Sequence, residues 1–217
     1  MKIFIDTANL NEIRKAKALG LVDGVTTNPT LLAKEGEETE SLIRKISEEV
    51  KGAVNVEVTG TTSEEMVKEA KVMATWGEEI VIKIPITPEG LKTVKILSSE
   101  GIHTNVTLLF SASQAILAAK AGATYVCPFL GRLDDISFNG LELIWQIKEI
   151  YGNYSDIKTQ IIVASIRHPI HVIESGMMGA EIVTIPPAII EQMVKHPLTD
   201  KGIAQFLEDA KKIGTKR

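Results

Sequence analysis

The sequence predicts a (β/α)8 barrel of the TIM type, followed by one additional C-terminal helix. Short β-branched runs alternate with helical patterns along all 217 residues, as in repeated β/α units that build a parallel sheet. Eight such units can be counted, which is the number that closes a barrel. A single barrel often spans roughly 200 to 250 residues. We therefore expect one barrel domain over residues 1–217.

The candidate strands are short runs bounded by turn-forming residues. They cover residues 2–6, 24–28, 54–59, 80–85, 103–108, 125–130, 160–166 and 181–185. Between them, apolar residues recur at helical spacing, as in Leu143, Ile144 and Ile147, which predicts amphipathic helices that cover the sheet. An open doubly wound sheet has the same alternation, so the pattern alone leaves it as an alternative. No glycine-rich nucleotide-binding motif supports that alternative.

Helix boundaries follow from capping residues. Asn9 and Thr62, the latter with Glu65 three residues later, suit helix starts, and Pro186-Pro187 opens a helix after the eighth strand. A further helix over residues 199–213 is surplus to the minimal barrel. It would pack on its own barrel or on a neighbouring subunit through an apolar face made of Ile203, Phe206, Leu207 and Ala210.

Composition excludes several classes of protein. The formal net charge is −4, and basic residues form no stripe, which argues against nucleic-acid binding. No segment resembles a signal peptide or reaches transmembrane length, so we expect a cytoplasmic protein without a membrane partner. The lone cysteine, Cys127, lies in an apolar run and is interpreted as a core thiol rather than a nucleophile.

Polar residues interrupt the predicted strands in register. Both faces of a parallel barrel strand are buried, so each polar residue in it needs an explanation. In the third strand, alternating side-chain directions turn the valines toward the helices and turn Asn55, Glu57 and Thr59 into the interior. The other polar residues of this kind are Asp6, Thr26, Asn28, Lys83, Asn105, Thr107 and Ser165. They gather toward the carboxyl ends of the strands, where barrel enzymes have their active sites.

Lys83 is the most informative of these residues. It lies in the apolar run Ile80–Pro85, and lysine is almost never buried without a partner. Burial disfavours the ammonium form, and a neutral amine is a nucleophile toward carbonyl groups. The alternative is structural: an ion pair with Asp6 or Glu57, or a lysine that reaches solvent from a wrongly assigned strand.

Two acids and two arginines accompany the lysine. Asp6 would cap a helix near Asn9 or act in proton transfer, and Glu57 would neutralise Lys83 or act in a second proton-transfer step. Arg132 and Arg167 follow adjacent strands, the sixth and seventh. A loop arginine is most often only a solvated charge, but guanidinium groups at these two strand ends suit a phosphate.

Five segments together resemble the transaldolase family, specifically its short bacterial and archaeal branch, which includes fructose-6-phosphate aldolase. The resemblance covers the chain essentially from end to end. The segments are Phe4-Ile5-Asp6-Thr7-Ala8, Gly24-Val25-Thr26-Thr27-Asn28-Pro29-Thr30, Val81-Ile82-Lys83-Ile84-Pro85, Asn105-Val106-Thr107-Leu108 and Ala164-Ser165-Ile166-Arg167.

The resemblance implies a class I aldolase-type enzyme of the pentose phosphate pathway that needs no metal and no organic cofactor. It would transfer dihydroxyacetone from sedoheptulose 7-phosphate to glyceraldehyde 3-phosphate. Lys83 corresponds to the Schiff-base lysine, Asp6 to the acid–base carboxylate, and Glu57 with Thr107 to the pair that holds the catalytic water. The residues expected to bind substrate are Thr26, Asn28, Asn105, Phe129, Arg132, Ser165 and Arg167.

Alternatives and partners follow from the same resemblance. Fructose-6-phosphate aldolases typically carry glutamine and tyrosine where this chain has Glu57 and Phe129, so the chain is closer to transaldolase at both positions. A non-catalytic barrel that binds sugar phosphates, with Lys83 only as an ion-pair partner, is a remote alternative. Short members form homo-oligomers, rings of five that often pair into decamers, and their C-terminal helix reaches a neighbouring subunit.

Overall fold

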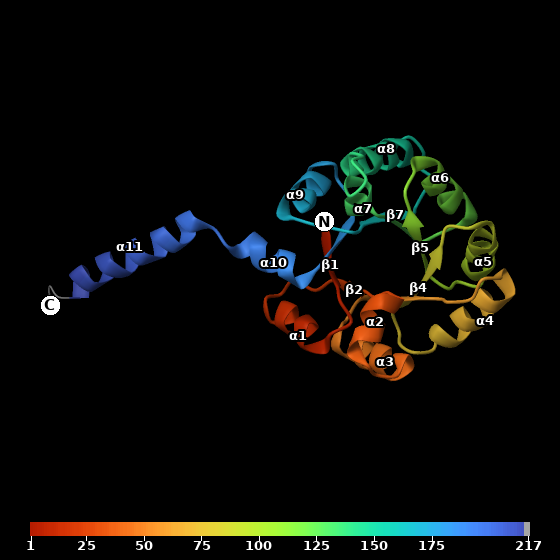
Figure 1. The fold of residues 1–217 in the computed structure, drawn as a ribbon, viewed down its shortest axis with the longest axis horizontal. Coiled ribbons are helices and arrows are strands. Elements are labelled where there is room, and N and C mark those ends of the chain that lie inside the picture. Colours follow the sequence, from red (N-terminus) through yellow and green to blue (C-terminus); the bar gives the residue numbers. More distant parts are fainter. Residues whose placement is uncertain (215–217) are drawn as a thin grey trace.

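A computed structural model, which describes residues 1–214, has eight parallel strands that close into a barrel in the order β1 to β8. The predicted (β/α)8 barrel is therefore confirmed, and the open sheet is excluded. The strands are β1 (Lys2–Asp6), β2 (Gly24–Thr26), β3 (Ala53–Glu57), β4 (Ile80–Pro85), β5 (Thr104–Leu109), β6 (Tyr125–Pro128), β7 (Gln160–Val163) and β8 (Ile182–Ile185). Figure 1 shows the helices as an outer ring around these strands.

The helices begin and end largely where capping residues predict. Asn9 caps α1, and Thr62 with Glu65 forms a capping box at the start of α4. The helices are α1 (Leu10–Ala18), α2 (Pro29–Glu35), α3 (Thr39–Glu49), α4 (Ser63–Met73), α5 (Pro88–Ser99), α6 (Ala112–Ala121), α7 (Leu130–Asp134), α8 (Gly140–Gly152), α9 (Pro169–Met177), α10 (Pro187–Val194) and α11 (Pro197–Gly214). The short helices α2 and α7 were not predicted, and both begin shortly after the carboxyl end of a strand, β2 and β6 respectively.

Two apolar layers stabilise the barrel. The larger layer lies between sheet and helices and includes Val54 and Val56 of β3, so the predicted orientation of this strand is confirmed. The smaller layer fills the barrel interior with Phe4, Ala53, Val81, Cys127, Ile162, Ala164 and Ile182. Full burial of a large apolar side chain, such as Phe4 or Ile162, stabilises the fold by about 1.5–3 kcal/mol. The interior layer also closes the barrel beneath the polar residues at its carboxyl end.

Several predicted strands end earlier than expected. Residues 27–28, 58–59, 130 and 165–166 lie beyond the strands, while Phe129 and Ala164 keep one isolated parallel bridge to each other. Asn28 and Phe129 precede α2 and α7 as their N-cap residues. Thr59 was expected inside the barrel, and this was wrong. It is exposed, and its backbone N–H donates a hydrogen bond to Glu69 at 2.7 Å. These segments form the rim at the carboxyl end of the barrel.

The final helix, α11, extends away from the barrel after α10 (Figure 1). Its apolar residues are exposed, with Phe206 at 76% and Leu207 at 60% of their full accessible surface. Of the two predicted positions for this helix, packing on its own barrel is therefore excluded. Among residues 1–214, no helix is both long enough and apolar enough to cross a membrane.

Candidate active site

Lys83 points into the barrel from β4 and is 3% exposed. Its Nζ donates a hydrogen bond to the backbone carbonyl of Thr27 at 2.9 Å and lies 3.3 Å from Oε2 of Glu57. Glu57 is the residue opposite Lys83 on the neighbouring strand β3. The predicted ion-pair alternative is therefore present for Glu57. The same distance allows the amine and the carboxylate to exchange a proton directly or through one water.

Asp6 ends β1 and lies opposite Thr26 of β2. Thr26 Oγ1 donates to Asp6 Oδ1 at 3.0 Å and lies 2.5 Å from Oγ1 of Thr184, which must then be the donor in that second bond. Burial raises the pKa of Asp6 above its usual 3.8, although the charge of Lys83 and the Thr26 hydrogen bond lower it. The capping alternative for Asp6 was wrong, because Asn9 caps α1.

Two buried amides lie beside the lysine. Asn55 Nδ2 donates to the Val25 carbonyl at 3.0 Å, and Asn105 Nδ2 donates to Asn55 Oδ1 at 2.8 Å. Asn105 lies opposite Lys83 on β5. Within residues 1–214, the buried Thr107 hydroxyl has no hydrogen-bond partner in the protein. Because a buried hydroxyl normally has a partner, Thr107 is suited to bind a small polar group in the site.

Cys127 belongs to the apolar layer beneath these polar groups. Burial raises the pKa of its thiol to about 12. A thiol in this state is almost fully protonated at neutral pH, and the thiolate is the nucleophilic form. The prediction that Cys127 is a core residue is confirmed by its burial.

The two predicted phosphate-binding arginines follow the paired strands β6 and β7 and are exposed at the same end of the barrel. The guanidinium carbon of Arg132 lies 4.9 Å from the ring centroid of Phe129, which packs edge-on against Phe110. Arg167 forms an ion pair with Asp135 at 2.7 Å. Because Asp135 is itself exposed, an incoming phosphate can replace it at modest energetic cost.

Ser165 has a left-handed backbone conformation, with φ at 62°. Its carbonyl oxygen approaches Gly131 so closely that a Cβ on Gly131 would lie 2.0 Å away, and Arg167 Cγ would lie 2.8 Å away. A glycine is therefore needed between Phe129 and Arg132. This close approach joins the segments after β6 and β7.

Gly131→Ala is expected to lower kcat/KM by about 10- to 100-fold, because displacing a binding residue by about 1 Å can cost that much. The overpacked backbone should also lower the free energy of unfolding by about 1–3 kcal/mol. Steady-state kinetics and thermal unfolding would measure both effects. Gly152→Ala is the matched control, since a Cβ there meets no atom within 4 Å. Equal behaviour of the two variants would contradict the steric argument.

Asn28 has a structural role as well as a predicted role in substrate binding, and two further residues contact the site without having been predicted. Asn28 Oδ1 accepts a hydrogen bond from the Leu31 N–H at 2.9 Å, so Asn28 also has a structural task as the cap of α2. Asn55 and Thr184 contact site residues but were not predicted to bind substrate. Thr184 was detectable, because it interrupts the apolar run of β8 as Thr26 interrupts β2. The Thr27 carbonyl that accepts from Lys83 leaves no signal in the sequence.

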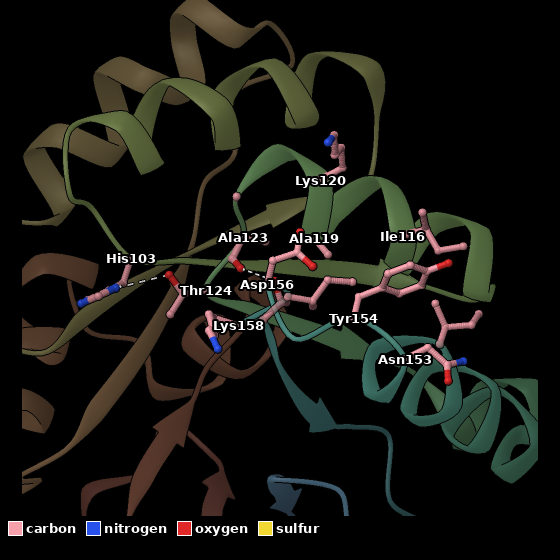
Figure 2. A pocket seen from close by; sticks show the side chains of 14 residues that line it. His103, Ile116, Ala119, Lys120, Ala123, Thr124, Asn153, Tyr154, Asp156 and Lys158 are labelled. Atoms are coloured by element: carbon pink, nitrogen blue, oxygen red, sulfur yellow. Dashed lines mark hydrogen bonds between the residues drawn. The ribbon is translucent and has the colours of Figure 1, made fainter.

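The described residues contain no cluster of three or more His, Cys, Asp or Glu that could hold a metal ion. A cleft of about 840 Å³, drawn in Figure 2, is lined by residues that directly precede β5, β6 and β7, such as His103, Thr124 and Thr159. It therefore lies at the amino ends of the strands, opposite the candidate site.

A (β/α)8 barrel with a buried lysine and two acids at the carboxyl ends of its strands has the arrangement typical of barrel enzymes. The family model described as Transaldolase/Fructose-6-phosphate aldolase matches residues 3–217, and the chain belongs to this family.

Relatives from three bacteria are similar over nearly their whole length. A "Probable transaldolase" of Caldicellulosiruptor saccharolyticus is 57% identical over 216 residues, covering 100% of both chains. A protein of the same name from a Thermoanaerobacter species is 56% identical, also over 100% of both chains. Another, from Aquifex aeolicus, is 55% identical over 100% of this chain and 99% of the relative.

Proposed function

We propose that this protein is a transaldolase that transfers dihydroxyacetone from sedoheptulose 7-phosphate to glyceraldehyde 3-phosphate through a Schiff base on Lys83. The observation that carries the proposal is the buried Lys83 amine within 3.3 Å of Glu57, with Asp6 close enough for the lysine charge to lower the pKa of its carboxyl. The products would be erythrose 4-phosphate and fructose 6-phosphate. The reaction belongs to the pentose phosphate pathway.

Schiff-base formation begins when the Lys83 amine attacks the C2 carbonyl of the ketose. The resulting carbinolamine loses its hydroxyl as water when it accepts a proton. Glu57, already in contact with Lys83, would first accept a proton from the Lys83 ammonium, which frees the amine for attack, and would then pass that proton to the departing hydroxyl through a water held by the Thr107 hydroxyl. The product is an iminium ion, which can accept an electron pair from the sugar chain.

Carbon–carbon cleavage is assigned to Asp6. Its carboxylate would remove the C4 hydroxyl proton while the electrons of the C3–C4 bond move to the iminium nitrogen, which leaves an enamine of dihydroxyacetone on Lys83. The first aldose phosphate departs. The raised pKa of Asp6 supports this role, because a stronger base accepts the proton more readily. In the reverse direction, Asp6 returns the proton to the new hydroxyl.

Substrate binding would use the groups around this centre. Arg132 and Arg167 are proposed to bind the phosphate of both aldoses, since guanidinium groups match phosphate oxygens in pairs. Thr26, Asn28, Asn105 and Ser165 are proposed to contact the sugar hydroxyls or the Schiff base. Phe129 would cover one side of the site, where it already packs against Arg132. A second aldehyde then reacts with the enamine, which predicts ping-pong kinetics.

Transfer is proposed over release because this chain has Phe129 and Glu57 where fructose-6-phosphate aldolases typically carry tyrosine and glutamine. A phenyl ring carries no hydroxyl that could deliver a proton to the enamine, so the enamine survives until an acceptor aldehyde binds. Fructose-6-phosphate aldolase, which would protonate the enamine and release dihydroxyacetone, is the second candidate because the family includes it. A barrel that only binds sugar phosphates is a remote third candidate.

A coupled assay separates these candidates. With sedoheptulose 7-phosphate and glyceraldehyde 3-phosphate, we expect erythrose 4-phosphate to form steadily. With fructose 6-phosphate alone, free dihydroxyacetone should appear far more slowly. Release of dihydroxyacetone as fast as transfer would instead identify an aldolase, and no turnover in either assay would identify a binding protein.

We further propose that α11 packs on a neighbouring copy of the chain, in a ring of five or a pair of such rings. Its exposed residues Leu198, Phe206 and Leu207 form an apolar surface that a monomer would leave in water. Light scattering should give a mass several times the 23.7 kDa of one chain. Phe206→Asp should lower this mass. A wild-type mass of one chain would contradict the proposal.

A further inference from the structure

His171 lies in the first turns of α9, outside the proposed catalytic residues, and is 3% exposed. Its Nδ1 accepts a hydrogen bond from the backbone N–H of Arg167 at 3.2 Å. Its Nε2 lies 3.0 Å from Oδ2 of Asp134 and donates to it. Both bonds together require the neutral tautomer with hydrogen on Nε2 and a bare Nδ1.

The ring therefore joins the two segments that carry the arginines. Arg167 lies in the segment between β7 and α9, and Asp134 is the last residue of α7, the helix that contains Arg132. The other carboxylate oxygen of Asp134 accepts the N–H of Gly140 at 2.8 Å, which ties the end of α7 to the start of α8. His171 is thus a buried link between Arg167 and a braced helix.

This link matters because Arg167 has few other hydrogen bonds or ion pairs among the described residues. β7 ends at Val163, so the arginine lies beyond the last strand residue. Its side chain pairs only with the exposed Asp135 among the contacts of the described residues, and exposed pairs contribute little to orientation. The partly buried hydrogen bond from the Arg167 backbone N–H to His171 does not depend on the arginine side chain and would persist when phosphate replaces Asp135.

We propose that His171 is a positioning residue that holds the Arg167 backbone at the distance from Arg132 that a substrate phosphate needs. This inference rests on the proposed function for the identity of the substrate, but not for the anion site itself. The charged groups around the ring agree with a neutral imidazole. Burial and the neighbouring His168 and Arg167 lower the pKa of His171, and Asp134 opposes them more weakly.

Two substitutions separate the two hydrogen bonds of His171. In His171→Asn, the amide oxygen can replace Nδ1 as acceptor for the Arg167 N–H. In His171→Gln, the amide nitrogen can replace Nε2 as donor to Asp134, but the acceptor for Arg167 is lost. The pair differs by one methylene group, so each variant controls for the other.

The test compares glyceraldehyde 3-phosphate with unphosphorylated glyceraldehyde as acceptor, at saturating donor. For His171→Gln, we expect KM for the phosphorylated acceptor to rise about tenfold, which corresponds to about 1.4 kcal/mol. We expect kcat and the kinetics with glyceraldehyde to stay near wild type. His171→Asn should restore most of the lost affinity. Equal losses with both acceptors, no loss in either variant, or no advantage of asparagine over glutamine would overturn the proposal.

Calorimetric binding of inorganic phosphate provides a readout that does not require turnover. The Kd for phosphate should rise about tenfold in His171→Gln and remain near wild type in His171→Asn. If wild-type protein binds phosphate but transfers no dihydroxyacetone, the proposed function fails while this inference is still tested. Unchanged phosphate affinity in folded His171→Gln, verified by thermal unfolding, would overturn the inference even in an active transaldolase.

Discussion

Replacing Lys83 with methionine is expected to abolish dihydroxyacetone transfer, with a loss in kcat on the order of 10⁴-fold or more, as is typical when a covalent nucleophile is removed. Methionine fills similar space without the amine, so the surrounding apolar strand should remain packed. Coupled assays of erythrose 4-phosphate formation would measure the loss.

Lys95→Met is the matched control for this variant, because Lys95 is an exposed lysine on α5. It should retain wild-type activity. Circular dichroism and thermal unfolding would verify that Lys83→Met is folded, since Glu57 loses its ion-pair partner. Substantial transfer by folded Lys83→Met would mean that the Lys83 amine has only a structural role, as an ion-pair partner of Glu57.

Replacing Asp6 with asparagine is expected to slow carbon–carbon cleavage by about 10²- to 10⁴-fold, the usual contribution of a positioned acid–base group. The substitution keeps the acceptor oxygen for Thr26 but removes the proton-accepting carboxylate. Schiff-base formation at Lys83 should still occur, so borohydride should still trap fructose 6-phosphate on the protein. Rapid-quench measurement of aldose release would follow cleavage. Unchanged turnover would rule out the proposed role of Asp6.

The same substitution should affect stability in a pH-dependent way. Burial raises the pKa of Asp6 in the folded protein above 3.8. Ionising this carboxyl therefore costs more free energy in the folded protein than in the unfolded chain. The ionised carboxyl therefore lowers the free energy of unfolding of the wild type at pH values above the pKa of Asp6 in the folded protein. It has no such effect at pH values below the pKa of Asp6 in the unfolded chain. We expect Asp6→Asn to be more stable by about 0.5–2 kcal/mol at pH 7, as often holds for strained active sites. Denaturant unfolding should show this gain disappearing below pH 3.8. A gain that persists there would contradict the stated cause.

Much of the fold could be predicted from local pattern. Strand positions followed from β-branched runs, and the capping box of Thr62 and Glu65 is present as expected. The carboxyl ends of strands were predicted too long at 27–28, 58–59, 130 and 165–166. The sequence pattern continues past the strand ends, and the contacts that hold these segments, such as the close approach of Gly131 to Ser165, are tertiary and cannot be predicted from local pattern.

The candidate site was predictable where polar residues break an apolar strand. Glu57 on β3 and Asn105 on β5 both lie opposite Lys83 on β4, so the residues that break the apolar pattern do meet in the barrel. Contacts made through backbone atoms or from helices leave no such signal. The Thr27 carbonyl and the His171 ring fall in this group, since a histidine within a helix has no pattern that distinguishes a buried link from a surface residue.

The central claim is that substrate becomes covalently bound to Lys83, and one measurement tests it directly. Wild-type protein would be incubated with fructose 6-phosphate, reduced with borohydride, digested, and mapped by mass spectrometry. A covalent adduct on the peptide that contains Lys83 is the predicted result. An adduct on another peptide, or no adduct while transfer proceeds, would contradict the proposed mechanism.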